Sequence, residues 1–196
     1  MGRRTDHSRD ELKELILSAA EEIVAESGSA ELTARSIAER IGYSVGTLYN
    51  FFEDLGDLVV HVNSRTLDAL YKTCVRSARH GGPQEDLRAY ARAYIRFTEK
   101  HERLWMMLLD RTSPRASELP EWYQSKVQRL LSLIEQTLVP LFHEDRQNER
   151  RRAARVLWAS LDGISSLANA RAIAAEASEL ADDLITTYVA GLASRP

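Results

Sequence analysis

Hydroxyl, amide and guanidinium side chains gather around a run of small residues between Leu32 and Leu58. Hydroxyl and amide groups hydrogen-bond to phosphate oxygens, and an arginine can bind the edge of a guanine through two hydrogen bonds. Small residues let the backbone approach a surface closely. Together, these residue types favour contact with a nucleic acid. The candidate contact residues are Thr33, Arg35, Ser44, Val45, Gly46, Thr47, Tyr49 and Asn50.

Two short helices joined by a tight turn are expected to position these residues. We expect Thr33 to cap the first helix, Gly42 to take the left-handed conformation of the turn, and Ser44 to cap the second helix. In such a helix-turn-helix the first helix crosses the DNA backbone and the second enters the major groove. The N-termini of both helices also present backbone N–H groups that can bind phosphate.

The same segment resembles the N-terminal domain of the TetR family of bacterial repressors. The resemblance implies that Arg35 reaches a base edge or a phosphate, that Val45 and Gly46 lie against base edges, and that Thr47 and Tyr49 hold phosphates. It also implies double-stranded DNA as a partner. The positions that carry the resemblance are Thr33, Arg35, Ile37, Ala38, Gly42, Ser44, Gly46, Thr47, Leu48, Tyr49, Phe52, Asp54 and Leu58.

The segment departs from the family's pattern at Val45, Glu53 and Leu55, where family members often carry basic or polar residues. The family's lysine at the position of Leu55 normally contacts phosphate, so its loss should weaken the salt dependence of binding. The chain through Phe52 is also net acidic. We therefore expect binding to depend on hydroxyl groups, helix N-termini and an N-terminal arm carrying Arg3 and Arg4.

The rest of the chain has a helical pattern almost everywhere, because apolar residues recur at helical spacing and proline and glycine are sparse. The chain has 196 residues and a net charge of −3. We predict an all-α fold of about nine helices. Residues 1–53 are expected to form a three-helix DNA-binding domain, and residues 54–196 a helical ligand-binding and dimerisation domain. No signal peptide or membrane-spanning stretch is recognised, so we expect a cytoplasmic protein without a membrane partner.

Caps and breakers predict where the helices begin and end. Ser8 and Glu11 are expected to form the capping box of the first helix, and Gly28 to end it. Asp54 is expected to cap the fourth helix. The fourth to ninth helices are expected over residues 55–78, 84–100, 102–109, 120–140, 149–172 and 178–193.

The last two predicted helices carry apolar stripes with small residues between them, a pattern typical of a four-helix bundle shared by two subunits. Ordinary packing within one subunit is the alternative. A dimer is favoured because two half-sites on DNA require two DNA-binding domains. The candidate interface residues are Ile164, Leu167, Leu184, Tyr188 and Leu192.

The middle helices are rich in aromatic and apolar residues, a composition that suits either a small-molecule pocket or a plain core. Residues Trp158 to Gly163 also resemble a W-x-x-x-H-G signature of one C-terminal subgroup of the family, with Asp162 in place of the histidine. Tyr94, His101 and Asn169 are further polar candidates. The candidate ligand-binding residues are Trp105, Met106, Leu109, Trp122, Tyr123, Val127, Trp158 and Asp162.

No catalytic constellation, phosphate-binding glycine loop or metal-ligand spacing is recognised, so we expect no enzyme, cofactor or metal ion. Cys74 is either a packed apolar residue, which we favour, or a redox sensor. The sequence predicts a homodimeric repressor that a small, largely apolar effector releases from a pseudo-palindromic operator. The alternative is a helical ligand-binding or interaction protein whose N-terminal domain no longer binds DNA.

Overall fold

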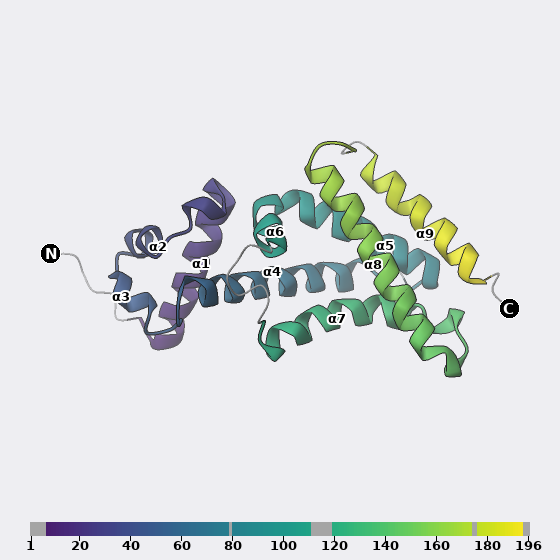
Figure 1. Ribbon diagram of the computed structural model, residues 1–196, viewed down its shortest axis with the longest axis horizontal. Helices are drawn as coiled ribbons and strands as arrows, with labels where there is room; N and C mark the ends of the chain where they lie inside the picture. Colours follow the sequence, from purple (N-terminus) through teal and green to yellow (C-terminus); the bar gives the residue numbers. More distant parts are fainter. Residues whose placement is uncertain (1–6, 79, 111–118, 174–175, 194–196) are drawn as a thin grey trace. The chain divides into compact units, whose positions relative to one another are not determined.

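The computed structural model describes residues 7–78, 80–110, 119–173 and 176–193. Within these ranges the chain forms α-helices and short 3₁₀ turns and no strand (Figure 1). The predicted all-α fold is therefore confirmed. The nine α-helices of the described residues are α1 (Arg9–Ser27), α2 (Ala34–Ile41), α3 (Val45–Leu48), α4 (Leu55–Ser77), α5 (Pro83–Lys100), α6 (Glu102–Leu109), α7 (Glu121–Thr137), α8 (Gln147–Asn169) and α9 (Ala177–Ala193).

The helices are divided between two compact units. The first unit comprises Met1–Thr66 and Arg103–Pro120, and the second comprises Leu67–Glu102 and Glu121–Pro196. The unbroken helix α4 contributes residues to both units. Helix α6 packs with the first unit, although about 40 residues separate it from Thr66, where the N-terminal segment of that unit ends.

Side-chain caps set the ends of the first helices. The Glu11 N–H donates to Ser8 Oγ (3.3 Å) and the Ser8 N–H donates to Glu11 Oε2 (2.8 Å), which confirms the predicted capping box of α1. Thr33 caps α2 as predicted, because its Oγ1 accepts from the Ser36 N–H at 3.0 Å. Gly42 ends α2 in the left-handed conformation, with φ of 75°.

The predicted cap of α3 differs. Ser44 precedes α3, but its hydroxyl pairs with the Thr47 hydroxyl at 3.0 Å and accepts no backbone N–H. The helix itself is a single turn that ends at Leu48. Asp54 does cap α4, because its carboxylate accepts the Asp57 N–H at 2.7 Å.

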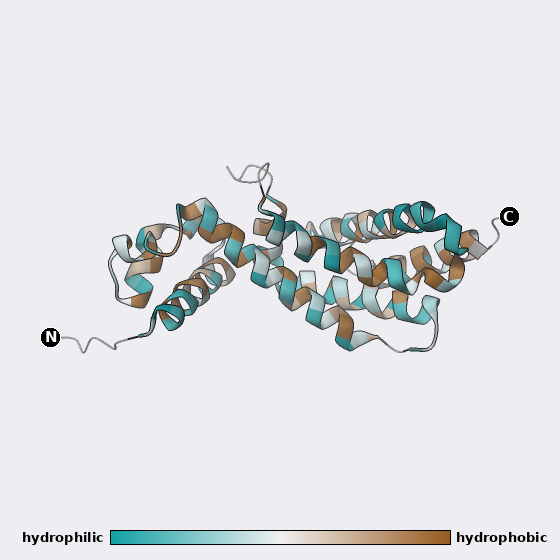
Figure 2. Ribbon diagram, turned by 90° about the horizontal axis from the view of Figure 1, so that it is seen from below, coloured by the Kyte–Doolittle hydropathy of each residue, from teal (hydrophilic) through white to brown (hydrophobic). Residues whose placement is uncertain are grey.

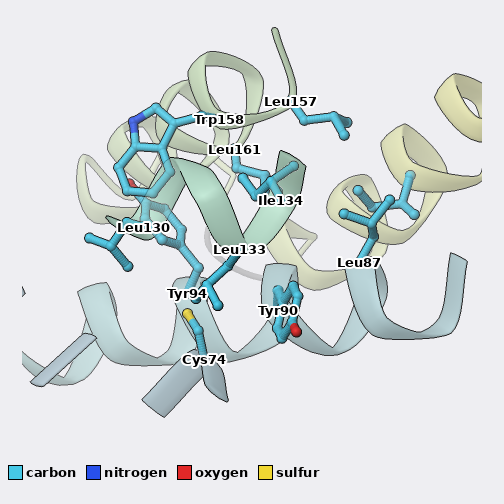
Figure 3. A pocket seen from close by; sticks show the side chains of 11 residues that line it. Cys74, Leu87, Tyr90, Tyr94, Leu130, Leu133, Ile134, Leu157, Trp158 and Leu161 are labelled. Carbon is cyan, nitrogen blue, oxygen red and sulfur yellow. The ribbon is translucent and has the colours of Figure 1, made fainter. Parts of the chain in front are cut away.

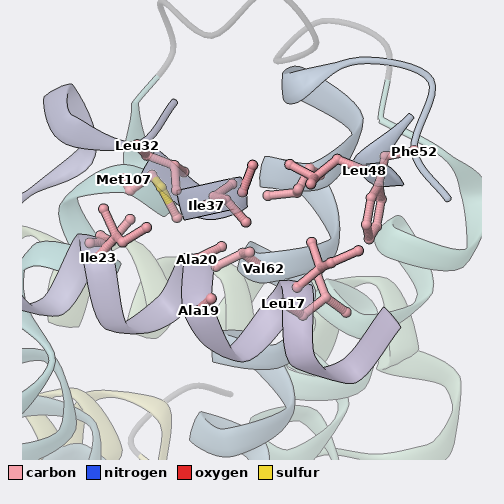
Figure 4. Close-up of a cluster of buried hydrophobic side chains, with 14 residues drawn as sticks. Leu17, Ala19, Ala20, Ile23, Leu32, Ile37, Leu48, Phe52, Val62 and Met107 are labelled. Atoms are coloured by element: carbon pink, nitrogen blue, oxygen red, sulfur yellow. The ribbon is translucent and has the colours of Figure 1, made fainter. Parts of the chain in front are cut away.

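The core of the first unit is built on α1, whose Leu17 and Ile23 lie among side chains from α2, α3 and α4 (Figure 4). Met107 of α6 completes this core and is 5% exposed. Leu55 packs against the same core, so an apolar residue there has a packing role. The buried core residues are Ile16, Leu17, Ala19, Ala20, Ile23, Val24, Leu32, Ile37, Ala38, Leu48, Phe52, Leu58, Val62 and Met107.

The second unit packs α5 against α8 and α9, and α7 against α8. Each helix carries hydrophobic and hydrophilic residues along its length, as amphipathic helices do (Figure 2). Polar contacts also join the helices. The Ser165 hydroxyl donates to Thr98 Oγ1 at 2.7 Å in the interior, and Asp68 of α4 pairs with Lys126 and Arg129 of α7.

Among the described residues, no helix combines the length and the apolar character that crossing a membrane would require.

Candidate functional site

The predicted contact residues lie between the start of α2 and the turn after α3. Ile37 of α2 and Leu48 of α3 are buried in the core, so their neighbours on the other side of each helix face outward. Val45 is 37% exposed and Tyr49 is 50% exposed, although both are large and largely apolar. Thr47 is half-buried. The exposed members of the set are Thr33, Arg35, Ser44, Val45, Gly46, Tyr49 and Asn50.

Gly46 is not required by the fold. A Cβ built on it would meet only Ser44 Oγ, at 3.8 Å, which is an ordinary van der Waals contact. Its backbone is helical, where alanine is more favourable than glycine. The glycine therefore leaves open space on the outside of α3, which suits close approach by another molecule.

The hydroxyl groups beside Gly46 are partly available. In the pair formed by Ser44 and Thr47, one hydroxyl donates to the other, so one O–H hydrogen remains for an outside acceptor. The imidazole Nδ1 of His7 lies 3.0 Å from the Tyr43 hydroxyl. This contact holds His7, with which the described part of the chain begins, beside the turn between α2 and α3. Arg3 and Arg4, predicted to form an arm, lie outside the described residues.

Arg35 extends from α2 and is paired with Glu39 one turn later, with Nε 2.8 Å from the carboxylate. The hydrogen bond that Arg35 donates to Glu39, followed by the charge of that carboxylate, raises the pKa of Arg35 above its ordinary value. The Arg35 side chain is nevertheless 84% exposed. Exposed ion pairs of this kind are weak, so Arg35 can exchange Glu39 for an outside acceptor at little cost.

Every arginine and lysine in the described part of the first unit contacts a carboxylate, a backbone carbonyl or an aromatic ring. Arg65 of α4 pairs with Glu14 and Glu21 of α1, while burial raises the pKa of Glu21 and Arg65 opposes that shift. The remaining contacts are Arg40 with Glu22 and Glu26, Arg35 with Glu39, Arg103 with the carbonyls of Ala25 and Glu26, Arg9 over Phe51 and Lys13 over Phe52. Four of the acidic residues of α1, namely Glu14, Glu21, Glu22 and Glu26, are thus paired with two arginines within the unit.

The second unit encloses a small apolar cavity of about 30 Å³, to which α4, α5, α7, α8 and α9 all contribute (Figure 3). Cys74 and the rings of Tyr90, Tyr94 and Trp158 are part of its lining. A cavity of this size holds about one water molecule.

The hydroxyl of Tyr94, one of the lining residues, donates to Asp162 Oδ1 at 2.9 Å. Burial, followed by the charge of Asp162, raises the pKa of Tyr94 well above its ordinary value, so the hydroxyl stays neutral. The Trp158 ring packs edge-on against Tyr94, with centroids 5.5 Å apart. Asp162 thus orients a cavity-lining tyrosine.

The predicted ligand-binding residues do not all gather at this cavity. Trp158 lines it, and Asp162 reaches it through Tyr94. The other candidates are placed elsewhere: in α6 of the first unit Trp105 is buried while Met106 and Leu109 are exposed, and on α7 Trp122 is exposed, Tyr123 buried and Val127 half-buried.

Sequence reasoning did not single out Cys74, Leu87 and Tyr90 as cavity residues. One available signal was the spacing of Leu87, Tyr90 and Tyr94, which places them on one side of α5. A helix that faces a cavity and one that faces a packed core share this spacing, so the sequence alone does not distinguish the two.

The predicted interface residues lie on α8 and α9. Leu167 is 52% exposed, and Ile164, Leu184 and Tyr188 are half-buried. Leu192 is buried within the unit, at 5% exposure. Four of the five residues therefore retain surface that a second molecule can cover.

Two family comparisons match this chain. The family of bacterial regulatory proteins named tetR matches residues 16–62, and the tetracyclin repressor-like C-terminal domain matches residues 87–188. A comparison with curated protein sequences gives no significant match.

Solved structures share the fold at low sequence identity. A protein of unknown function from Rhodococcus sp. RHA1 has a TM-score of 0.78 and 20% identity over 98% of this chain and 100% of its own. The transcriptional regulator SCO7222, a TetR from Streptomyces coelicolor, gives 0.69 and 21% over 97% of this chain and all of its own. BioQ, solved with its natural double-stranded DNA operator, gives 0.65 and 19% over 93% of this chain and 98% of its own.

The C-terminal match alone covers more than half of the chain, and the N-terminal match contains the whole of α2 and α3. Members of this family regulate transcription and are not enzymes, in agreement with the sequence-based expectation. The chain belongs to the TetR family of transcription regulators, and α2 and α3 are its DNA-binding helix-turn-helix.

Proposed function

We propose that the protein is a homodimeric repressor that binds a pseudo-palindromic operator through α2 and α3 and is released by a small, largely apolar effector. The observation that carries the proposal is the outward surface of α3, where Val45 is exposed and Gly46 leaves open space that the fold does not need. Both features are explained by close contact with base edges in the major groove.

Neutral groups supply much of the phosphate binding in this proposal, because the described cations of the first unit already have partners. The hydroxyls of Thr33, Thr47 and Tyr49 and the amide of Asn50 fix the position on the DNA backbone. Arg35 releases Glu39 to reach a base edge or a phosphate. We also propose that Arg3 and Arg4 bind in the minor groove.

The dimer is proposed to form through α8 and α9, where Ile164, Leu167, Leu184 and Tyr188 retain exposed apolar surface. A two-fold interface brings two DNA-binding units to half-sites that lie about 34–36 Å apart on the operator. We place the protein in the cytoplasm, because a bacterial regulator of transcription acts where the chromosome lies.

The effector is proposed to bind in the second unit by enlarging the apolar cavity. Small-molecule pockets usually have volumes of about 300–1,000 Å³, so an effector must part the helices that line the present cavity of about 30 Å³. Tyr94 and Asp162 then offer it a polar anchor. Release from DNA requires that the effector bind the enlarged form more tightly than the closed one. An effector that binds without changing operator affinity would contradict this part of the proposal.

Selection of random DNA duplexes by the purified protein tests the DNA-binding proposal. We expect an enriched pseudo-palindrome, with Arg35→Ala relaxing the preference at one position in each half-site and Tyr49→Phe weakening binding to all sequences alike. If low salt yields no enriched palindrome, the alternative of a ligand-binding or interaction protein with an inactive N-terminal unit is supported instead.

Gly46→Ala separates DNA contact from folding. We expect the variant to be as stable as the parent or more stable by up to about 1 kcal/mol, because alanine is the better helix former and the site has room for a Cβ. Operator binding should nevertheless weaken at least tenfold in a gel-shift titration, since the added methyl group faces the DNA. Equal affinity of the two proteins would place Gly46 outside the interface.

A further inference from the structure

A second hollow, of about 280 Å³, lies on the surface of the second unit at the end of α4 and along α5. Three of its lining residues are arginines spaced four residues apart, namely Arg88, Arg92 and Arg96. Residues at this spacing share one face of a helix. The hollow is therefore lined by a row of guanidinium groups, although the whole chain carries a net charge of −3.

Only one of the three arginines has a carboxylate partner among the described residues. Arg92 binds Asp182 of α9, with Nε 3.0 Å from Oδ1. Arg88 donates from Nη2 to the Thr186 hydroxyl at 2.7 Å, while its Nε is buried without a hydrogen-bond partner. Arg96 is exposed and makes no ion pair with another described residue. Arg88 and Arg96 thus have no carboxylate partner in the part of the chain that the structure describes.

The carboxylate of Glu85 does not neutralise them. Glu85 lines the hollow, but its side chain folds back so closely on Gly81 that Oε2 would occupy the place of a Cβ on that glycine. Guanidinium groups bind carboxylate and phosphate through paired hydrogen bonds. An oxyanion in the hollow would supply the counter-charge that Arg88 and Arg96 lack among the described residues.

A purely structural role accounts for only part of this arrangement. Arg88 and Arg92 each join α5 to α9, through Thr186 and Asp182, and such contacts hold helices together without any ligand. This explanation does not extend to Arg96, which makes no hydrogen bond or ion pair with the described residues of α9, or to the hollow itself.

We propose that this hollow binds a small ligand with two or more oxyanion groups, phosphate or carboxylate, and that Arg88 and Arg96 are its anchors. The volume suits a compound of about the size of citrate or a short polyphosphate. The site is distinct from the apolar cavity, since the two linings share no residue, so the inference does not depend on the proposed effector.

Isothermal titration calorimetry of the full chain with two probes, pyrophosphate and citrate, tests the proposal. We expect at least one probe to bind at millimolar concentration or below and glucose, as an uncharged compound of similar size, not to bind. Binding of only one of the two anions would identify the ligand class as phosphate or as carboxylate. If neither anion binds, the proposal is wrong.

Arg96→Gln is the decisive variant, because Arg96 is exposed and has no hydrogen bond or ion pair with another described residue. We expect it to weaken probe binding about tenfold, the usual effect of losing a charge-assisted hydrogen bond. Arg155→Gln removes the same charge from an exposed site on α8 that does not line the hollow, and should leave binding unchanged. Equal losses in both variants would reveal only a general effect of charge and would overturn the proposal.

Arg88→Lys provides a second variant that keeps the charge and loses the paired hydrogen bonds. We expect weaker probe binding with an unfolding midpoint close to that of the parent, measured without ligand. If this variant binds the probe as tightly as the parent does, Arg88 does not contact the ligand, and the proposal that Arg88 and Arg96 both anchor it is wrong.

Discussion

The thiol of Cys74 lies against the apolar cavity and is 6% exposed. Burial raises its pKa to about 12 from the ordinary value of 9.0. Since the thiolate is the reactive form of cysteine, almost none of the folded protein carries a reactive thiol near neutral pH. This environment favours a packing role for Cys74 over a redox-sensor role.

We expect the native protein to react with the thiol reagent DTNB at pH 8 at least a hundred times more slowly than the urea-unfolded chain does. The physical reason is that reaction requires both exposure of the sulfur and loss of its proton. Comparing the two rates by absorbance at equal pH provides the measurement. Similar rates would show that the cavity opens freely, and the packing interpretation would then fail.

At the scale of helices, the two hydroxyl residues predicted as caps make different contacts. Thr33 accepts a backbone N–H of α2, whereas Ser44 bonds only to the Thr47 side chain. We expect Thr33→Ala to lower the free energy of unfolding by about 1 kcal/mol, the usual loss for an N-cap, and Ser44→Ala to change it by less than about 0.5 kcal/mol. Urea denaturation of the two variants checks this, and an equal loss in both would mean that Ser44 also acts as a cap.

The helix ends show how far the sequence determines the fold. The capping box at Ser8 and the left-handed Gly42 were predictable, because each depends on residues close in sequence and on local backbone geometry. The hydroxyl pairing of Ser44 was not, because a serine before a helix can bond equally well to a backbone or a side-chain donor. The spacing of exposed and buried residues in α2 and α3 was likewise readable from the helical period.

The packing of α6 with the first unit was not predictable from its sequence. Its run of apolar residues suits either core, and the choice depends on contacts with residues far away in the chain. Arg103 donates to the carbonyls of Ala25 and Glu26 at the end of α1, and Met107 fills the core of the same unit. The cavity could not be predicted for the same reason, since five helices distant in sequence form it.

Met107→Ala tests the structural role of α6. We expect the free energy of unfolding of the first unit to fall by about 2–5 kcal/mol, because the variant leaves a void in a packed core. The neighbouring Met106 is 60% exposed and serves as a matched control, for which alanine should cost less than about 0.5 kcal/mol. Hydrogen exchange of the α1 amides reports on this unit directly. If these amides are equally protected in Met107→Ala and Met106→Ala, α6 does not stabilise the first unit through Met107.

At the scale of the whole molecule, the proposed dimer depends on exposed apolar residues of α8 and α9. We expect Leu167→Glu to dissociate the dimer, since a carboxylate buried in an interface is costly, while leaving the subunit folded because Leu167 is half exposed. Sedimentation equilibrium measures the mass. Val75→Glu places the same charge on a comparably exposed valine of α4 and should leave the mass unchanged. A dimer that survives Leu167→Glu would require a different interface.

Because α6 belongs to the first unit, the core of that unit is still incomplete when the helix-turn-helix leaves the ribosome. Met107 follows Thr66 by roughly 40 residues, so at a synthesis rate of about 5–20 residues per second the last core residue arrives roughly 2–8 s later. During that interval the apolar surface that Met107 will cover remains open on a nascent chain. We therefore expect the core of this unit to be complete only after more than half of the protein has been made.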